Sequence, residues 1–229
     1  MQMIAGIDGC GSRWLAVAHV PRSTSFVAKL LETSELPSQS WALAAIDIPI
    51  GLSSKGSREA DLAARKFIGS RRNSVFPSPI RPALVASSWQ EACEITFAHD
   101  GRRISQQTFA ILPKIREVDE CIRSANLQQC LFEIHPEVSF AAWNGSPTLH
   151  SKKDKVGAEQ RQMLIAKHFG MDAFASVESQ VGQRNIAKDD IADAFAALWS
   201  ANRRFVGIAQ RLPNYEVMDS HGLPMNIWY

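Results

Sequence analysis

Three acidic residues occur where a carboxylate is unusual, inside or at the end of short apolar runs of strand character. They are Asp8, Asp47 and Glu133. A single acid in such a run most often caps a turn or pairs with an arginine, because an unpaired buried carboxylate is strongly unfavourable. Three of them in one chain favour a shared site, since the strand ends of an α/β sheet gather at one edge.

Two further acids lie in the strongest helical pattern of the chain, residues 187–203. Asp190 and Asp193 are three residues apart and therefore share a helix face. Alanine and phenylalanine surround Asp193, so we expect this face to be partly buried. Two carboxylates in such a place repel each other unless a cation lies between them. The alternative is a helix with acids in its first turn and one stray acid after it.

The five acids form an oxygen-rich and histidine-poor set, which suits Mg²⁺ or Mn²⁺ better than zinc. The predicted metal ligands are Asp8, Asp47, Asp190 and Asp193, and Glu133 is a further catalytic candidate. Two such ions about 4 Å apart can activate a water and stabilise the leaving oxygen of a phosphodiester. His135 follows Glu133 by two residues on the same predicted strand. It is a candidate for proton transfer or, equally, a structural histidine.

Positive charge is concentrated near these acids. The whole chain has a formal net charge of +2, whereas residues 58–81 contain six basic and two acidic residues. Such a patch favours contact with a phosphate backbone, so we expect nucleic acid of unspecified type as the partner. The candidate ligands for it are Arg71, Arg72, Lys114, Lys152 and Lys153. The two arginines are the better candidates because a proline-rich loop holds them, whereas each lysine, taken alone, fits a surface lysine better.

The hydrophobic pattern predicts the elements that position these residues. Strands are expected near residues 3–8, 14–18, 25–31, 42–50 and 131–135, and helices at 57–69, after Ser88, at 158–169 and at 187–203. Residues 105–126 also have a helical pattern but contain Pro113. We expect two helices there, with Pro113 in the first turn of the second. The chain therefore reads as a single α/β domain over 1–229 with a mostly helical, basic insertion at about 53–127.

Composition narrows the class of protein. The 229 residues are 45% hydrophobic and 21% charged, which excludes disordered and fibrous proteins. The four cysteines form no C-x-x-C pair, so a zinc knuckle or a disulfide framework is not expected. No signal peptide and no apolar run long enough to span a membrane is present. We expect a soluble cytoplasmic protein with no membrane partner; the oligomeric state is not indicated.

The order of these motifs resembles the ribonuclease-H-like fold, a mixed sheet flanked by helices. The resemblance rests on a strand with Asp8, a following hairpin, a strand with Asp47 and a late helix with Asp-x-x-Asp. The pair Asp190 and Asp193, followed by Ala194, is similar to the C-terminal acidic helix of Holliday-junction resolvases. The chain departs from ribonucleases H in having no match for the acid on their first helix.

More closely, the chain resembles an uncharacterised bacterial and archaeal family described as predicted ribonuclease-H-like nucleases. The motifs that carry this resemblance are Gly6–Cys10 with Trp14, Ala45–Leu52, Arg71–Pro77, Pro113–Asp119, Glu133–Phe140, Lys152-Lys153, Asp189–Ala194 and Gly222–Tyr229. It implies a metal-dependent nuclease.

Two other functions remain open. One is a phosphotransferase or ATPase of the actin and sugar-kinase type, whose first phosphate loop would be 8–12. The other is a non-catalytic nucleic-acid-binding protein, in which arginine or lysine neutralises the acids.

Overall fold

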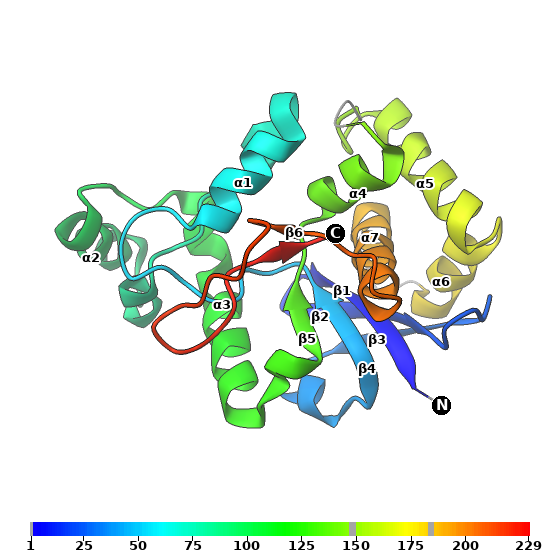
Figure 1. Cartoon of the computed structure of the whole chain (residues 1–229), viewed down its shortest axis with the longest axis horizontal. Coiled ribbons are helices and arrows are strands. Elements are labelled where there is room, and N and C mark those ends of the chain that lie inside the picture. Colours follow the sequence, from blue (N-terminus) through cyan, green and yellow to red (C-terminus); the bar gives the residue numbers. More distant parts are fainter. Residues whose placement is uncertain (1, 147–149, 183–185) are drawn as a thin grey trace.

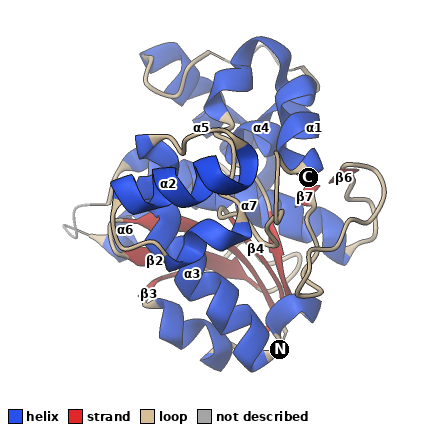
Figure 2. Cartoon of the chain, turned by 90° about the vertical axis from the view of Figure 1, so that its left-hand side faces the viewer, coloured by secondary structure: helices blue, strands red, loops and turns tan. Residues whose placement is uncertain are grey.

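A five-stranded mixed sheet forms the centre of the computed structural model, which describes residues 2–146, 150–182 and 186–229. Its strands are β1 Met3–Cys10, β2 Arg13–His19, β3 Phe26–Leu31, β4 Trp41–Ile46 and β5 Leu131–Glu133. Their order across the sheet is β3-β2-β1-β4-β5. Helices cover the sheet (Figures 1 and 2). The predicted α/β class is confirmed.

Strand direction determines where the acids meet. β1 pairs antiparallel with β2, and β2 antiparallel with β3, which gives the predicted hairpin and third strand. β4 is parallel to β1, and β5 is parallel to β4. The carboxyl ends of β1, β4 and β5 therefore lie at one edge of the sheet. Asp47 follows β4 directly, and its N–H donates to the carbonyl of Ile7 at 3.0 Å.

Seven helices and several short elements complete the described part of the chain. The helices are α1 Glu59–Ile68, α2 Trp89–Asp100, α3 Gln106–Ala125, α4 Pro136–Asn144, α5 Lys155–Phe169, α6 Ala173–Val181 and α7 Lys188–Phe205. The 3₁₀ turns are η1 Thr33–Ser38, η2 Gly69–Ser74, η3 Arg81–Val85 and η4 Leu127–Gln129, and a two-stranded ribbon joins β6 Arg211–Leu212 to β7 Ile227–Trp228. None of these helices combines the length and apolar composition needed to cross a bilayer.

The predicted division of residues 105–126 into two helices is wrong. α3 runs without a break through Pro113. Proline removes one backbone donor and normally kinks or ends a helix. Here the fully buried Leu112, Ile115 and Val118 anchor the helix on both sides of Pro113. Tertiary packing therefore overrides the local preference of the proline.

Two hydrophobic cores lie on opposite faces of the sheet, because successive strand residues alternate between the faces. One contains Ile4, Val17 and Ala45 and packs against α7. The other contains Ile7 and Ile46 and packs against the buried side of α3. The helical segment predicted at about 53–127 contributes to both cores, α1 to the first and α3 to the second.

Gly6 allows α7 to lie directly on β1. A Cβ at this position would be 2.1 Å from the backbone nitrogen of Leu198 and 2.2 Å from the carbonyl oxygen of Ala194. Both atoms belong to the backbone of α7 and cannot rotate away. This close contact sets the depth at which α7 holds Asp193 over the end of β1.

We predict that Gly6→Ala destabilises the protein by at least about 2 kcal/mol, because the added methyl group forces α7 away from the sheet. Gly9→Ala is the matched control on the same strand. Its Cβ would lie 3.0 Å from the end of the Lys114 side chain and 3.8 Å from the Trp14 ring, with no backbone atom as close as those that Gly6 would meet. Its effect should stay within about 1 kcal/mol. Chemical denaturation measures both, and equal stabilities of the two variants would contradict the account.

Candidate functional site

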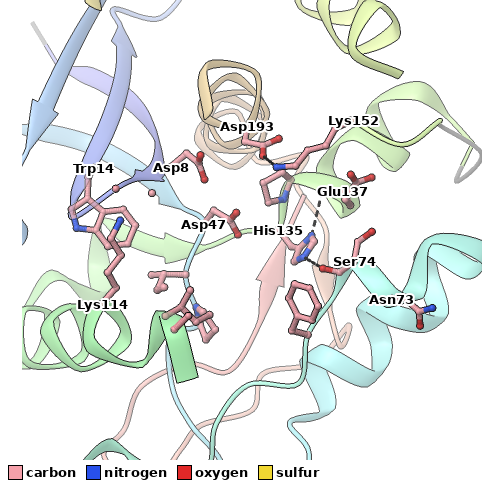
Figure 3. Close-up of a pocket in the computed structure, with 18 of the residues that line it drawn as sticks. Asp8, Trp14, Asp47, Asn73, Ser74, Lys114, His135, Glu137, Lys152 and Asp193 are labelled. Carbon is pink, nitrogen blue, oxygen red and sulfur yellow. Dashed lines mark hydrogen bonds and ion pairs between the residues drawn. The ribbon is translucent and has the colours of Figure 1, made fainter. Parts of the chain in front are cut away.

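A cavity of about 1010 Å³ opens at the carboxyl edge of the sheet. Its walls come from the ends of β1 and β4, from α3, from η2 with the loop after it, and from the start of α4. Three of the predicted acids line it: Asp8, Asp47 and Asp193. Figure 3 shows them around a common space. Asp193 comes from α7 and the other two from the sheet, so distant parts of the chain build one acidic wall.

Asp8 and Asp47 form a carboxyl pair in which Asp8 is buried and Asp47 is partly buried. Asp8 is 7% exposed, and burial raises its pKa well above the ordinary value, with Asp193 and Asp47 adding to the rise. Burial likewise raises the pKa of Asp47 to about 8, although a hydrogen bond with the Asp8 side chain opposes the rise. Such a bond requires a proton on one of the two groups. Without a cation, the pair therefore retains a proton at neutral pH.

Asp193 is balanced by a lysine. Its Oδ2 accepts a hydrogen bond from Lys152 Nζ at 2.7 Å, and the same Nζ lies 3.3 Å from Asp189. Burial raises the pKa of Asp193 to about 6, and Lys152 opposes this rise. The neighbouring acids raise the pKa of Lys152, so it stays charged. A lysine thus neutralises one acid of the wall, as expected for a non-catalytic binder, whereas Asp8 and Asp47 form no ion pair within the described residues.

The donor set fits a hard divalent cation only in part. Across the described ranges, no three histidine, cysteine, aspartate or glutamate side chains meet closely enough to hold a metal ion by themselves. The predicted four-carboxylate ligand set is therefore not assembled in this arrangement. Mg²⁺, however, is commonly held by one or two carboxylates together with waters and substrate phosphates. Asp8 and Asp47 match that pattern, because both carry only oxygen donors and both face the cavity.

Asp190 lies beside the cavity and does not line it. It is in the first turn of α7, where its Oδ2 accepts from the backbone N–H of Ala187 at 3.4 Å. Its side chain also interacts with the Cys10 thiol. Burial raises the pKa of Asp190, and its charge raises that of Asp8. Asp190 therefore raises the pKa of Asp8 from outside the cavity, whereas Asp193 is the acid of α7 that lines the cavity.

The structure places Glu133 apart from the other predicted acids. Its neighbour Leu131 packs in the core on the α3 face, so alternation along β5 directs Glu133 away from the α7 face. There it forms a two-pronged ion pair with Arg58, at 2.6 and 2.8 Å, and accepts the N–H of Ile50 at 2.7 Å. Arg58 is 2% exposed and also pairs with Asp61. Glu133 is a buried structural carboxylate.

His135 is engaged at both ring nitrogens. It does not continue β5, as the sequence suggested, but is the N-cap of α4. Its Nδ1 accepts the N–H of Glu137 at 3.2 Å, so the proton is on Nε2, which lies 3.3 Å from the carbonyl oxygen of Ser74. Burial lowers the pKa of His135 and favours the neutral ring. These contacts make His135 a brace of the cavity wall (Figure 3) and leave no free nitrogen for proton transfer.

Four of the five predicted phosphate ligands line the cavity: Arg71, Lys114, Lys152 and Lys153. Lys114 is fixed, because its Nζ donates to the carbonyl of Arg13 at 2.8 Å and lies 4.3 Å from the centre of the Trp14 ring. Arg72 is the exception. With Arg65 and Lys66 it borders a separate hollow of about 500 Å³.

The basic patch is smaller than the sequence suggests. Arg58 is buried in its ion pairs, and Arg65 donates to the carbonyl of Val75 at 2.7 Å. Arg81 pairs with Asp119 and Asp219. These three side chains hold the helical segment together, which leaves fewer charges for a ligand.

Sequence reasoning missed the residues that hold Arg71 in place. Glu137 accepts from Arg71 at 3.2 Å and from Arg161 at 2.9 Å. Arg161 is 1% exposed and also donates to the carbonyls of His150 and Gly157. Glu137 belongs to the motif that begins at Glu133, which was a usable signal. Nothing in the helical pattern around Arg161 distinguished it from a surface arginine.

The family of the chain follows from a comparison with family models. A model described as "Protein of unknown function (DUF429)" matches residues 6–217. The chain belongs to this family. The matched region contains the whole acidic wall of the cavity. No curated protein and no solved structure matches the chain.

We predict that the metal-free protein loses stability as the pH rises from about 5 to 8. Unfolded aspartates ionise near 3.8, whereas Asp47 holds its proton to about pH 8 in the folded chain. The folded state therefore binds more protons in this window, so its stability is highest at the acidic end and falls with pH. The loss should be at least about 1.4 kcal/mol, the equivalent of one pKa unit.

Thermal and urea melts in chelator test this expectation, and Asp47→Asn should flatten the profile. Mg²⁺ should offset the loss at pH 8 in the wild type and much less in the variant, because binding to the folded state alone stabilises it. Metal-free stability that rises across this window would contradict the assignment of raised pKa values to the pair.

Proposed function

We propose that this protein is a nuclease that depends on Mg²⁺ or Mn²⁺ and hydrolyses phosphodiester bonds of nucleic acid. The observation that carries the proposal is the pairing of the buried Asp8 with the partly buried Asp47, without an ion-pair partner in the described structure, at the wall of a large cavity. Buried carboxyl groups with strongly shifted pKa values that face a cavity mark functional sites more often than structural ones.

The arrangement of charges supports the same proposal. Asp8 and Asp47 would hold the divalent ion, which supplies the charge that activates a water and stabilises a leaving oxygen. Arg71 and Lys153 line the same cavity and are suited to binding phosphate oxygens. Glu137 and Arg161 orient Arg71. Lys152 keeps Asp193 ionised and adds a positive charge beside the acids.

The fold resemblance is a second support. The antiparallel β1–β2–β3 meander, the parallel strand β4 that ends before Asp47, and the late helix α7 with Asp193 agree with the features that suggested a ribonuclease-H-like fold. We therefore propose that the sheet is of this type. Asp190 lies outside the cavity, and Lys152 pairs with Asp193. Only Asp8 and Asp47 then remain as carboxylate ligands, so we propose that the site holds one cation and not two.

One observation favours the phosphotransferase alternative, so the experiment must also test for it. The turn between β1 and β2 lines the cavity through Gly9, Gly11 and Ser12. A phosphate loop would occupy this position. ATP consumption is therefore measured beside nucleic-acid cleavage, and ATP hydrolysis without cleavage would overturn the nuclease proposal.

We predict that the wild-type protein cleaves a labelled oligonucleotide with Mg²⁺ or Mn²⁺ and not with chelator. Asp8→Asn and Asp47→Asn should each lower kcat by at least about 100-fold, comparable to the removal of one preorganised electrostatic group. Denaturing gels that resolve product lengths provide the measurement and also distinguish internal from terminal cleavage.

Glu133→Gln is the matched control, because it also removes one buried carboxylate charge at the edge of the sheet. It should lose on the order of 3 kcal/mol of stability, since Arg58 is left partly unpaired. At a temperature where it is folded, its kcat should remain within about threefold of the wild type. Equal loss of cleavage in Glu133→Gln and Asp47→Asn would mean that the carboxyl pair has no special role.

A further inference from the structure

The cavity contains a feature that phosphate binding and metal binding do not require. Beside the charged residues, part of its wall is apolar, built from Trp14, Ile48, Phe76, Ile111 and Pro113. A site that contacts only the sugar-phosphate backbone needs donors and positive charge there. An apolar wall suits the flat face of a base.

Phe76 is the residue in this wall that is free to make such a contact. It is 50% exposed, whereas its neighbour Val75 is 2% exposed. Its ring makes no aromatic or cation–π contact within the described residues. A large apolar ring that is left open inside a cavity is available to a ligand.

The backbone on both sides of Phe76 is anchored. The carbonyl of Val75 accepts from Arg65 at 2.7 Å, and that of Pro77 accepts from the Thr108 hydroxyl at 3.0 Å. One residue further, the N–H of Ser78 donates to Asp61 at 2.8 Å. The ring is therefore exposed on a fixed support. This arrangement reduces the entropy that a ligand would otherwise lose in ordering the loop.

Two polar residues shortly before Phe76 in the sequence, Arg71 and Asn73, indicate which other groups of a ligand the cavity could contact. Asn73 lines the cavity from η2 and also borders the neighbouring hollow, and its side-chain amide makes no hydrogen bond to another described residue. An amide carries both a donor and an acceptor and can bind a base edge. Arg71, two residues earlier, provides the charge for a phosphate. Within one short segment, the cavity thus offers contacts for phosphate, base edge and base face.

We propose that the cavity binds one unpaired nucleotide, with its base stacked on Phe76 and its phosphate toward Arg71 and the acidic wall. This proposal rests on the proposed function and names its substrate class: single-stranded nucleic acid, or a free nucleotide with the same chemistry. A paired base has both faces covered by its neighbours and cannot stack on a side chain without leaving the helix. The ring therefore selects unpaired over duplex substrate.

Binding without turnover tests the proposal. The probe is a fluorescein-labelled oligothymidylate, alone or annealed to its complement, titrated in Mg²⁺ with protein that carries Asp8→Asn to block cleavage. The single strand should bind at least about tenfold more tightly than the duplex. Adding Phe76→Ala should weaken single-strand binding by about 5- to 150-fold, the range that corresponds to loss of one stacked base, and Phe76→Trp should restore it.

Phe97→Ala is the matched control, since Phe97 is 59% exposed on α2 and does not line the cavity. Duplex binding as tight as single-strand binding, or equal effects of Phe76→Ala and Phe97→Ala, would overturn the proposal. Competition with thymidine monophosphate identifies the source of the nucleotide: strong displacement indicates a free nucleotide and weak displacement a strand, and either supports the stacking site. Stacking without cleavage by the wild type would refute the nuclease function alone.

Discussion

The site depends on the electrostatic interaction between the carboxyl groups of Asp8 and Asp47, which lie close together in a place with little access to water. Burial raises the pKa of each carboxyl group, and the charge of Asp47 raises that of Asp8 further, so the two do not both ionise at neutral pH without a counter-charge. The protein places no arginine or lysine directly on this pair within the described chain, although it pairs most of its other buried acids. Because no basic side chain is paired with these two carboxyl groups, they can bind a proton or a cation. The remaining features of the cavity are arranged around this unbalanced pair.

The fold places its buried ion pairs away from the acids that line the cavity. Glu133, on the α3 face of β5, is ion-paired with Arg58, which also pairs with Asp61 of α1. On the α7 face, the missing Cβ of Gly6 lets α7 approach closely enough to bring Asp193 to the same cavity as Asp8. The sheet itself keeps the two sets apart, since residues on neighbouring positions of a strand face opposite sides. One edge of the sheet thus carries both an ion-paired network and a carboxyl pair without an ion-pair partner in the described structure.

The sequence was sufficient for the sheet and for the main acids because both depend on local pattern. Apolar runs that end in an acid predicted β1 and β4, and the spacing of Asp190 and Asp193 predicted an acidic helix face. Glu133 could not be assigned from pattern, because its partner Arg58 is 75 positions away in sequence. Arg161 could not be recognised for the same reason, because its partner Glu137 is 24 positions away in sequence. Pro113 was misjudged because packing on both sides of it outweighs its local effect.

The central claim is that Asp8 and Asp47 form a cation site, and crystals grown in Mn²⁺ test it most directly. Anomalous scattering locates manganese without assuming its ligands. The account predicts a peak between the two carboxyl groups, at about 2.0–2.3 Å from an oxygen of each, with water in the remaining positions. Crystals saturated with Mn²⁺ that show no peak there, or a peak only at exposed acids elsewhere, would contradict it.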